Sequence, residues 1–219
     1  MRTKGRINIS PVQGVRSNRY SGSKMTNWTD FDSTDSAINK IYNQLYESIY
    51  DEKRTGIFIH QEATHKEFIM SLSIEDVKAK LEMLPEKFTQ GLKAVLLLSG
   101  SNKQLKVFDS KLFAYGTYWN DIIFIHPFPK RNMNLYYRKG LKPNIKNDYE
   151  RVGAVVERDD KIGMWIRWTM ENLKTFYLRD VLVHEIGHHF DKNSKKTEGF
   201  AEWFATEYGF KFRFYDKTL

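Results

Sequence analysis

Two spacings of hydrophobic residues recur along the chain, and they predict a mixture of helices and strands. Apolar positions three and four residues apart, often after a residue that caps helices, predict helices over 35–49, 73–84, 168–191 and 197–209. Short apolar or β-branched runs predict strands over 56–60, 93–98, 106–108, 113–119 and 122–126. The last two runs flank Asn120-Asp121, a pair typical of a tight turn, and therefore predict a hairpin. The expected fold is α+β: a small mixed β-sheet with packed helices on one face.

The length of 219 residues fits one domain with an extension. Residues 1–34 have six basic side chains, two acidic ones and no sustained apolar period, which predicts a flexible basic arm before a domain over 35–219. Residues 130–146 contain six basic residues, no acidic residue and two neighbouring tyrosines, and we expect a loop-like insertion there. Both basic segments could bind nucleic acid, although a solvated chain is the simpler interpretation of each.

The composition excludes several classes of protein. The chain has no cysteine, which excludes disulfide scaffolds, thiolate metal sites and thiol nucleophiles. No apolar run approaches the roughly 18 residues that span a bilayer. No apolar stretch follows the basic start in the manner of a secretory signal. We therefore expect a cytoplasmic protein with no membrane partner.

The predicted helix over 168–191 contains His184-Glu185-Ile186-Gly187-His188. Four residues of α-helix turn about 400° and rise about 6 Å, so the two histidines lie within about 40° of each other and can bind one metal ion. Glu185 lies at the edge of the same face, where it can act on a water molecule without being a ligand. This is the pattern of a zinc hydrolase, with two histidine ligands and a general base. Histidines without such spacing are expected to be structural or on the surface: His60, His65 and His126.

A catalytic zinc ion usually has a third protein ligand, and acidic residues are the remaining candidates. Asp191 lies close to His188 and is better placed to hydrogen-bond a ligand than to bind the metal. Glu198 begins the next predicted helix, where its charge is favourable at the helix N-terminus. Glu202 lies one turn further, between two nonpolar residues, where a carboxylate without a partner would be costly. The sequence therefore favours Glu202 as the third ligand and leaves Glu198 as the alternative.

These residues carry a family resemblance. The segments His184–Asp191 and Phe200–Ala205 resemble two motifs of the gluzincin metallopeptidases, among them the catalytic domain of anthrax lethal factor and the Pro-Pro endopeptidases. The resemblance implies a zincin-like metallopeptidase domain that hydrolyses peptide bonds of a protein or peptide substrate. It implies that Glu185 is the catalytic base and that the ligands of Zn2+ are His184, His188 and Glu202. Residues 112–126 are similar to the substrate-side edge strand of these enzymes, which implies substrate binding by Tyr115, Gly116 and Tyr118.

Two features leave alternatives open. Where those peptidases have a tyrosine seven residues before the ligand glutamate, which stabilises the oxyanion, this chain has Lys195. The electrophilic partner is therefore one of four residues: Tyr118, His189, Lys195 or Tyr208. The short connection between the motifs also resembles the ImmA/IrrE-type peptidases, which cut regulatory repressors. The competing class is a catalytically inactive module that binds nucleic acid or protein, and the net charge of +8 favours it.

Overall fold

The computed structural model describes residues 32–102, 104–105, 115–137, 143–159, 163–191 and 198–211. Residues 1–31 of the predicted arm, and the strand predicted over 106–108, lie outside these ranges. The first described helix begins at Asp32, so the boundary predicted after residue 34 falls inside that helix.

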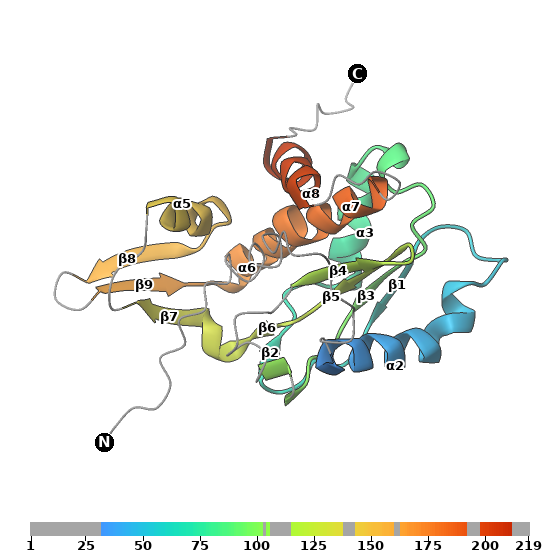
Figure 1. The fold of residues 1–219 in the computed structure, drawn as a ribbon, viewed down its shortest axis with the longest axis horizontal. Helices are drawn as coiled ribbons and strands as arrows, with labels where there is room; N and C mark the ends of the chain where they lie inside the picture. Colours follow the sequence, from blue (N-terminus) through green and yellow to red (C-terminus); the bar gives the residue numbers. More distant parts are fainter. Residues whose placement is uncertain are drawn as a thin grey trace.

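A four-stranded mixed sheet with strand order β1-β3-β5-β4 lies at the centre of the molecule (Figure 1). Its strands are β1 (Phe58–Gln61), β3 (Ala94–Leu97), β4 (Gly116–Trp119) and β5 (Ile122–Ile125). β3 pairs in parallel with β1 and β5, whereas β4 pairs antiparallel with β5 and forms an edge. The predicted hairpin is confirmed. Asn120 and Asp121 have φ angles of 52° and 61°, the left-handed conformation that a type I′ turn requires at both central residues.

Helices cover both faces of this sheet (Figure 1). Ala94 and Leu96 of β3 pack with apolar residues of α2 (Asp32–Ile49) on one face. Val95 and Leu97 belong to the larger core on the other face, which α3 (Ile74–Met83) and the helices after residue 169 complete. The prediction of helices on one face is therefore wrong. β3 is apolar at consecutive positions because both of its sides are buried.

The cap predicted for α3 is confirmed. Ser73 and Asp76 form a reciprocal capping box, in which each side chain accepts a hydrogen bond from the backbone of the other. Asp76 also forms an ion pair with Lys174, so the start of α3 is tied to the long helix described next.

The helix predicted over 168–191 is present in three consecutive parts. These are α6 (Met170–Phe176), a π-helical segment η4 (Tyr177–Val181) and α7 (Leu182–Phe190). Thr169 caps the N-terminus by accepting a hydrogen bond from the Asn172 amide. Most of α7 is buried, and it packs against β4 and β5.

The following helix returns along α7 and η4 in the antiparallel direction. It consists of α8 (Glu198–Phe204) and a π-helical continuation, η5 (Ala205–Lys211). Gly187 lies against Ala201, and Gly209 lies against the backbone of Arg179. The prediction that Gly209 ends this helix is wrong, because the helix continues to Lys211. A Cβ atom at Gly209 would collide with the carbonyl oxygen of Arg179, so this glycine permits the close approach of two helical segments.

A smaller antiparallel sheet with order β7-β9-β8 lies at one end of the molecule (Figure 1). Its strands are β7 (Asn134–Tyr137), β8 (Val155–Asp159) and β9 (Gly163–Arg167), and α5 (Pro143–Arg151) packs on β8. The loop-like insertion predicted over 130–146 is therefore wrong, because its described residues supply β7 and the start of α5. Leu135 within this segment and Tyr149 shortly after it are both buried in the main core.

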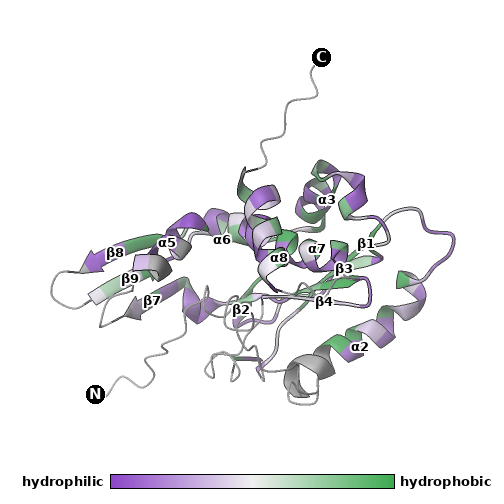
Figure 2. Cartoon of the chain, turned by 45° about the horizontal axis from the view of Figure 1, so that its top comes forward, coloured by the Kyte–Doolittle hydropathy of each residue, from purple (hydrophilic) through white to green (hydrophobic). Residues whose placement is uncertain are grey.

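Short elements complete the described structure. β2 (Phe68–Ile69) pairs antiparallel with β6 (Phe128–Pro129), and two 3₁₀ turns lie at η2 (Glu86–Phe88) and η3 (Lys130–Met133). The small sheets and packed helices agree with the α+β prediction. In Figure 2 strand β3 of the central sheet is mainly green, for hydrophobic residues, and β4 is nearly white, whereas α2 and α3 carry both hydrophobic and hydrophilic residues. Among the described helices, none is long and apolar enough to cross a membrane.

Candidate metal centre

The metal-ligand motif lies on a helix that another helix approaches very closely. A Cβ atom built at Gly187 would be 2.9 Å from Cα of Ala201 and 3.1 Å from Cβ of Phe204. A residue larger than glycine would therefore push α8 away from α7. The first turn of α8 lies beside His184 and His188, because Glu198 contacts both of them.

Three side chains converge at this point. The Nε2 atoms of His184 and His188 are 3.1 Å apart, and they lie 3.3 Å and 3.5 Å from the two carboxylate oxygens of Glu198. One ligand atom from each residue fits within 4.8 Å of the others. Zinc bonds of about 2.0–2.1 Å in tetrahedral geometry give ligand-to-ligand separations of about 3.3–3.4 Å. The donor set therefore fits one metal ion bound by all three residues.

The carboxylate at this centre belongs to Glu198 and not to Glu202, which the sequence favoured. On a helix, residues four apart share a face but differ by about 6 Å along the axis. Helical periodicity alone therefore cannot distinguish these two glutamates. In the structure it is the carboxylate of Glu198 that lies beside the two histidines. Burial does not separate the two glutamates, because both are half-buried and the Glu198 side chain is 34% exposed.

The two histidines also determine the charge of Glu198. Burial by itself would raise the pKa of this carboxyl, but hydrogen bonds with His184 and His188 lower the pKa far below its ordinary value. Glu198 is consequently an anion, the form of a carboxylate that binds a metal ion.

Glu185 lies between α7 and the edge strand. Its side chain is buried, and a Cβ atom at Gly116 would be only 2.6 Å from its Oε1 atom. The missing side chain of Gly116 thus leaves the space that the Glu185 carboxylate occupies. The structure brings together two residues that the sequence assigned to different roles, the base and a substrate-binding position.

The two predicted substrate-binding tyrosines are placed differently. Tyr115 is 1% exposed, and its ring packs against Phe128, Phe176 and Tyr177 in the core. The ring of Tyr115 therefore lies in the core, and its assignment to substrate binding stays a prediction. Tyr118 is partly buried on β4, and its hydroxyl is engaged within the protein.

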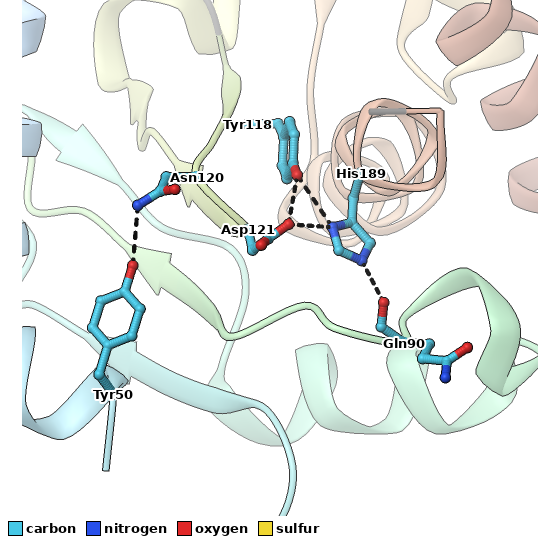
Figure 3. A network of polar contacts seen from close by, with 6 residues as sticks. All are labelled: Tyr50, Gln90, Tyr118, Asn120, Asp121 and His189. Carbon is cyan, nitrogen blue, oxygen red and sulfur yellow. Dashed lines mark hydrogen bonds and ion pairs between the residues drawn. The ribbon is translucent and has the colours of Figure 1, made fainter. Parts of the chain in front are cut away.

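Tyr118 belongs to a polar network that joins the hairpin to α7 (Figure 3). Its hydroxyl donates a hydrogen bond of 2.9 Å to Oδ1 of Asp121 and lies 3.3 Å from Nδ1 of His189. Asp121 Oδ1 is 3.4 Å from the same nitrogen. The other nitrogen of His189 donates a hydrogen bond of 3.0 Å to the carbonyl oxygen of Gln90. Sequence reasoning missed Asp121 and Gln90, because their roles arise from contacts distant in sequence.

This network bears on the candidate electrophilic partners. Burial, followed by the hydrogen bond to Asp121, raises the pKa of Tyr118, so its hydroxyl keeps its proton. Both Tyr118 and His189 are already engaged with protein groups. Tyr208 packs its ring on Phe88 and Phe204. Lys195 lies outside the described residues.

His126, one of the histidines expected to be structural, directly follows β5 and is fully buried. Its ring contacts Gln104 at 3.1 Å and Thr117 at 3.4 Å, and its carbonyl oxygen accepts a hydrogen bond from Tyr177. Burial lowers the pKa of His126 to about 4, so the ring is neutral at pH 7. This agrees with a structural role.

Comparisons of the chain with models of protein families, with curated proteins and with solved structures found no match. The gluzincin resemblance therefore stays a prediction.

Proposed function

We propose that this protein is a zinc-dependent metallopeptidase whose metal ligands are His184, His188 and Glu198. The observation that carries the proposal is the convergence of two imidazole nitrogens and a carboxylate, separated by 3.1 Å, 3.3 Å and 3.5 Å. Two histidines and a glutamate are a known ligand set of catalytic zinc, and they leave a position open for water or substrate. When bound there, zinc supplies a water molecule of lowered pKa and polarises a carbonyl oxygen.

Glu185 is the proposed general base. It follows the ligand His184 directly in α7, and its carboxylate is buried at 7% exposure, where few water molecules compete for its oxygens. In this role it takes the proton of the attacking water and later gives it to the nitrogen of the leaving amine. Gly116 contributes by leaving room for this carboxylate beside the strand.

The edge strand β4 suggests how a peptide would bind. In the described part of the sheet, β4 pairs with β5 on one side only. Backbone groups on the other side can pair with an extended substrate, a mode of recognition in which the peptide adds a strand to the sheet. Such a peptide would pass beside Gly116 and Glu185, and the contact would come from the backbone of β4 and not from the buried ring of Tyr115.

Metal analysis of matched variants tests the ligand set. We expect about one zinc ion per chain in the parent. Glu198→Gln should weaken zinc binding at least about 100-fold. Loss of a residue that only supports a ligand lowers metal affinity by about 10–100-fold, and loss of a ligand itself should lower it by more. Glu202→Gln is the control, since it makes the same change one turn away on the same face of α8. Loss of zinc from the Glu202 variant, with zinc retained by the Glu198 variant, would reverse the assignment.

Cleavage of a broad peptide library tests the reaction. Glu185→Gln should keep its zinc and lose at least about 100-fold in the rate of hydrolysis of any cleaved peptide. Gly116→Ala should also keep zinc but lower the rate, because the new Cβ displaces the Glu185 carboxylate. Gly199→Ala is its control, since a Cβ there meets nothing within 4 Å. A parent that binds zinc but cleaves no peptide would contradict a general peptidase and favour the inactive binding module.

A further inference from the structure

Strand β4 packs against helix α7, and two pairs of residues show how they meet. Gly116 lies against the carboxylate of Glu185, and Tyr118 lies against the ring of His189, with ring centroids 5.6 Å apart. Residues two apart on a strand point to the same face and are separated by about 6.6–6.8 Å. Residues four apart on a helix share a face and rise about 6 Å. The two contacts therefore match in register along the strand and the helix.

We propose that Tyr118, Asp121, His189 and the carbonyl group of Gln90 form a clasp that sets this register. The clasp would hold β4 at a fixed position along α7. It would thereby also fix the position of Gly116, beside which the Glu185 carboxylate lies. His189 is then a positioning residue, distinct from its neighbour His188, which binds the metal. The inference rests on the proposed function for its effect on catalysis, but the clasp itself is a structural statement.

The contacts of His189 support this role. Its side chain is 2% exposed, and both ring nitrogens are engaged, one with the hairpin and one with the chain before β3 (Figure 3). A carbonyl oxygen can only accept, so Nε2 carries a proton and donates to Gln90. A buried imidazole with fixed contacts at both nitrogens cannot rotate without losing a hydrogen bond in a nonpolar environment. His189 thus joins α7, the β4–β5 turn and the segment after η2.

Strand β4 needs support beyond its hydrogen bonds within the sheet. β4 is bonded to β5 alone in the described sheet, so its hydrogen bonds fix it on one side. The clasp holds the turn end of the same strand through side chains. Displacement of a reacting group by about 1 Å can lower a rate by about 100-fold, so small shifts of β4 matter for Glu185.

The turn itself provides a matched pair of variants. Tyr118 binds Asp121, and Tyr50 accepts a hydrogen bond of 3.1 Å from Asn120, the other central residue of the same turn (Figure 3). Tyr118→Phe removes the hydroxyl that also faces α7. Tyr50→Phe removes a hydroxyl from the side of the turn that faces α2. Only the first change opens the clasp.

The first measurement is hydrogen exchange of the zinc-loaded protein, which needs no substrate. Tyr118→Phe should speed the exchange of the amides of 116–119 by about tenfold, the effect of losing one hydrogen bond that limits local opening. Tyr50→Phe should leave the same amides unchanged. Equal effects of both variants, or no effect of Tyr118→Phe, would overturn the clasp.

The second measurement uses a peptide that the parent cleaves. Tyr118→Phe should lower kcat by about tenfold or more with KM and zinc content nearly unchanged. His189→Gln, which keeps an N–H able to reach Gln90 but loses the contact with the hairpin, should behave in the same way. Unchanged kcat in both variants would overturn the positioning role. A parent without peptidase activity would refute the proposed function, while hydrogen exchange would still decide whether the clasp exists.

Discussion

The two larger sheets of this protein are held in different ways. In the central sheet, β3 and β5 are fully buried at every position, because α2 covers one face and α3, α6 and α7 cover the other. In the smaller sheet, α5 packs on one side, while Val155 on the outer strand β8 and Arg167 on the central strand β9 are exposed. The candidate metal centre lies against the sheet that is packed on both faces.

The difference indicates where this molecule can support precise geometry. The register between β4 and α7 depends on buried neighbours on several sides. The smaller sheet is attached to the core by its inner residues, such as Ile166. Residues on its exposed face have few packing contacts, so substitutions there should have little effect on stability. We therefore expect the central sheet to respond strongly to perturbation and the smaller sheet to respond weakly.

Acid should destabilise the protein through His126, the buried residue that follows β5, and this is the largest expected effect on stability. Its pKa is about 4 in the folded protein and about 6.5 in the unfolded chain, so the unfolded chain takes up a proton first as the pH falls. The stability from this group is complete above pH 6.5 and is lost between pH 6.5 and 4, by about 3 kcal/mol. Urea unfolding of the parent and His126→Asn at several pH values measures the difference. Parallel pH profiles of the two proteins between pH 7 and 4.5 would contradict it.

Two valines, one in each sheet, allow a matched comparison of the effect of a substitution on the free energy of unfolding. Val95 in β3 is 0% exposed, whereas Val155 in β8 is 43% exposed. Val95→Ala should lower the free energy of unfolding by about 2 kcal/mol, because it removes two buried methyl groups and leaves a cavity. Val155→Ala should stay within about 0.5 kcal/mol of the parent. Urea denaturation measures both, and equal losses would show that the smaller sheet is as tightly packed as the central one.

The same difference explains what the sequence could predict. The strands of the central sheet and the metal-ligand helix have strong local patterns: continuous apolar runs, the Asn120-Asp121 turn, and two histidines four residues apart. The strands of the smaller sheet have few buried positions, and basic residues around Leu135 concealed the apolar side of β7. Local patterns therefore identified the elements with the most burial and missed those with the least.

The candidate site shows a second limit of sequence reasoning. Glu198 and Glu202 are four residues apart and share a face of α8, so no helical pattern could separate them. The packing of α8 against α7 places the Glu198 carboxylate beside His184 and His188. Similarly, the clasp joins Gln90 to His189 across 99 positions of sequence. The register between helices and the contacts between distant residues arise from packing. They could therefore be read from the structure but not from local sequence patterns.

Two ion pairs of equal length sharpen the comparison between the sheets. Arg151 at the end of α5 is 3.1 Å from Asp180 in η4, and the Asp180 side chain is 4% exposed. Arg151→Met should cost about 1–3 kcal/mol, because a buried carboxylate loses a charged partner. Thermal unfolding measures this loss. Because the pair joins α5 to the long helix, limited proteolysis should also cut the smaller sheet first in this variant, and uniform cleavage along the chain would contradict that attachment.

The second pair lies on the exposed face of the smaller sheet. Arg167 is also 3.1 Å from Glu157, but these side chains are 51% and 48% exposed. Water screens such a pair and both long side chains lose freedom in forming it, so Arg167→Met should change the free energy of unfolding by less than about 1 kcal/mol. The remaining effect should disappear in about 1 M salt, where the screening length is about 3 Å, whereas the Arg151 effect should persist because Asp180 is shielded from solvent. Urea unfolding of the two variants at low and high salt measures this. A salt-resistant loss on Arg167→Met comparable to that of Arg151→Met would mean that the outer face of the smaller sheet is covered, and that the contrast between the sheets is wrong.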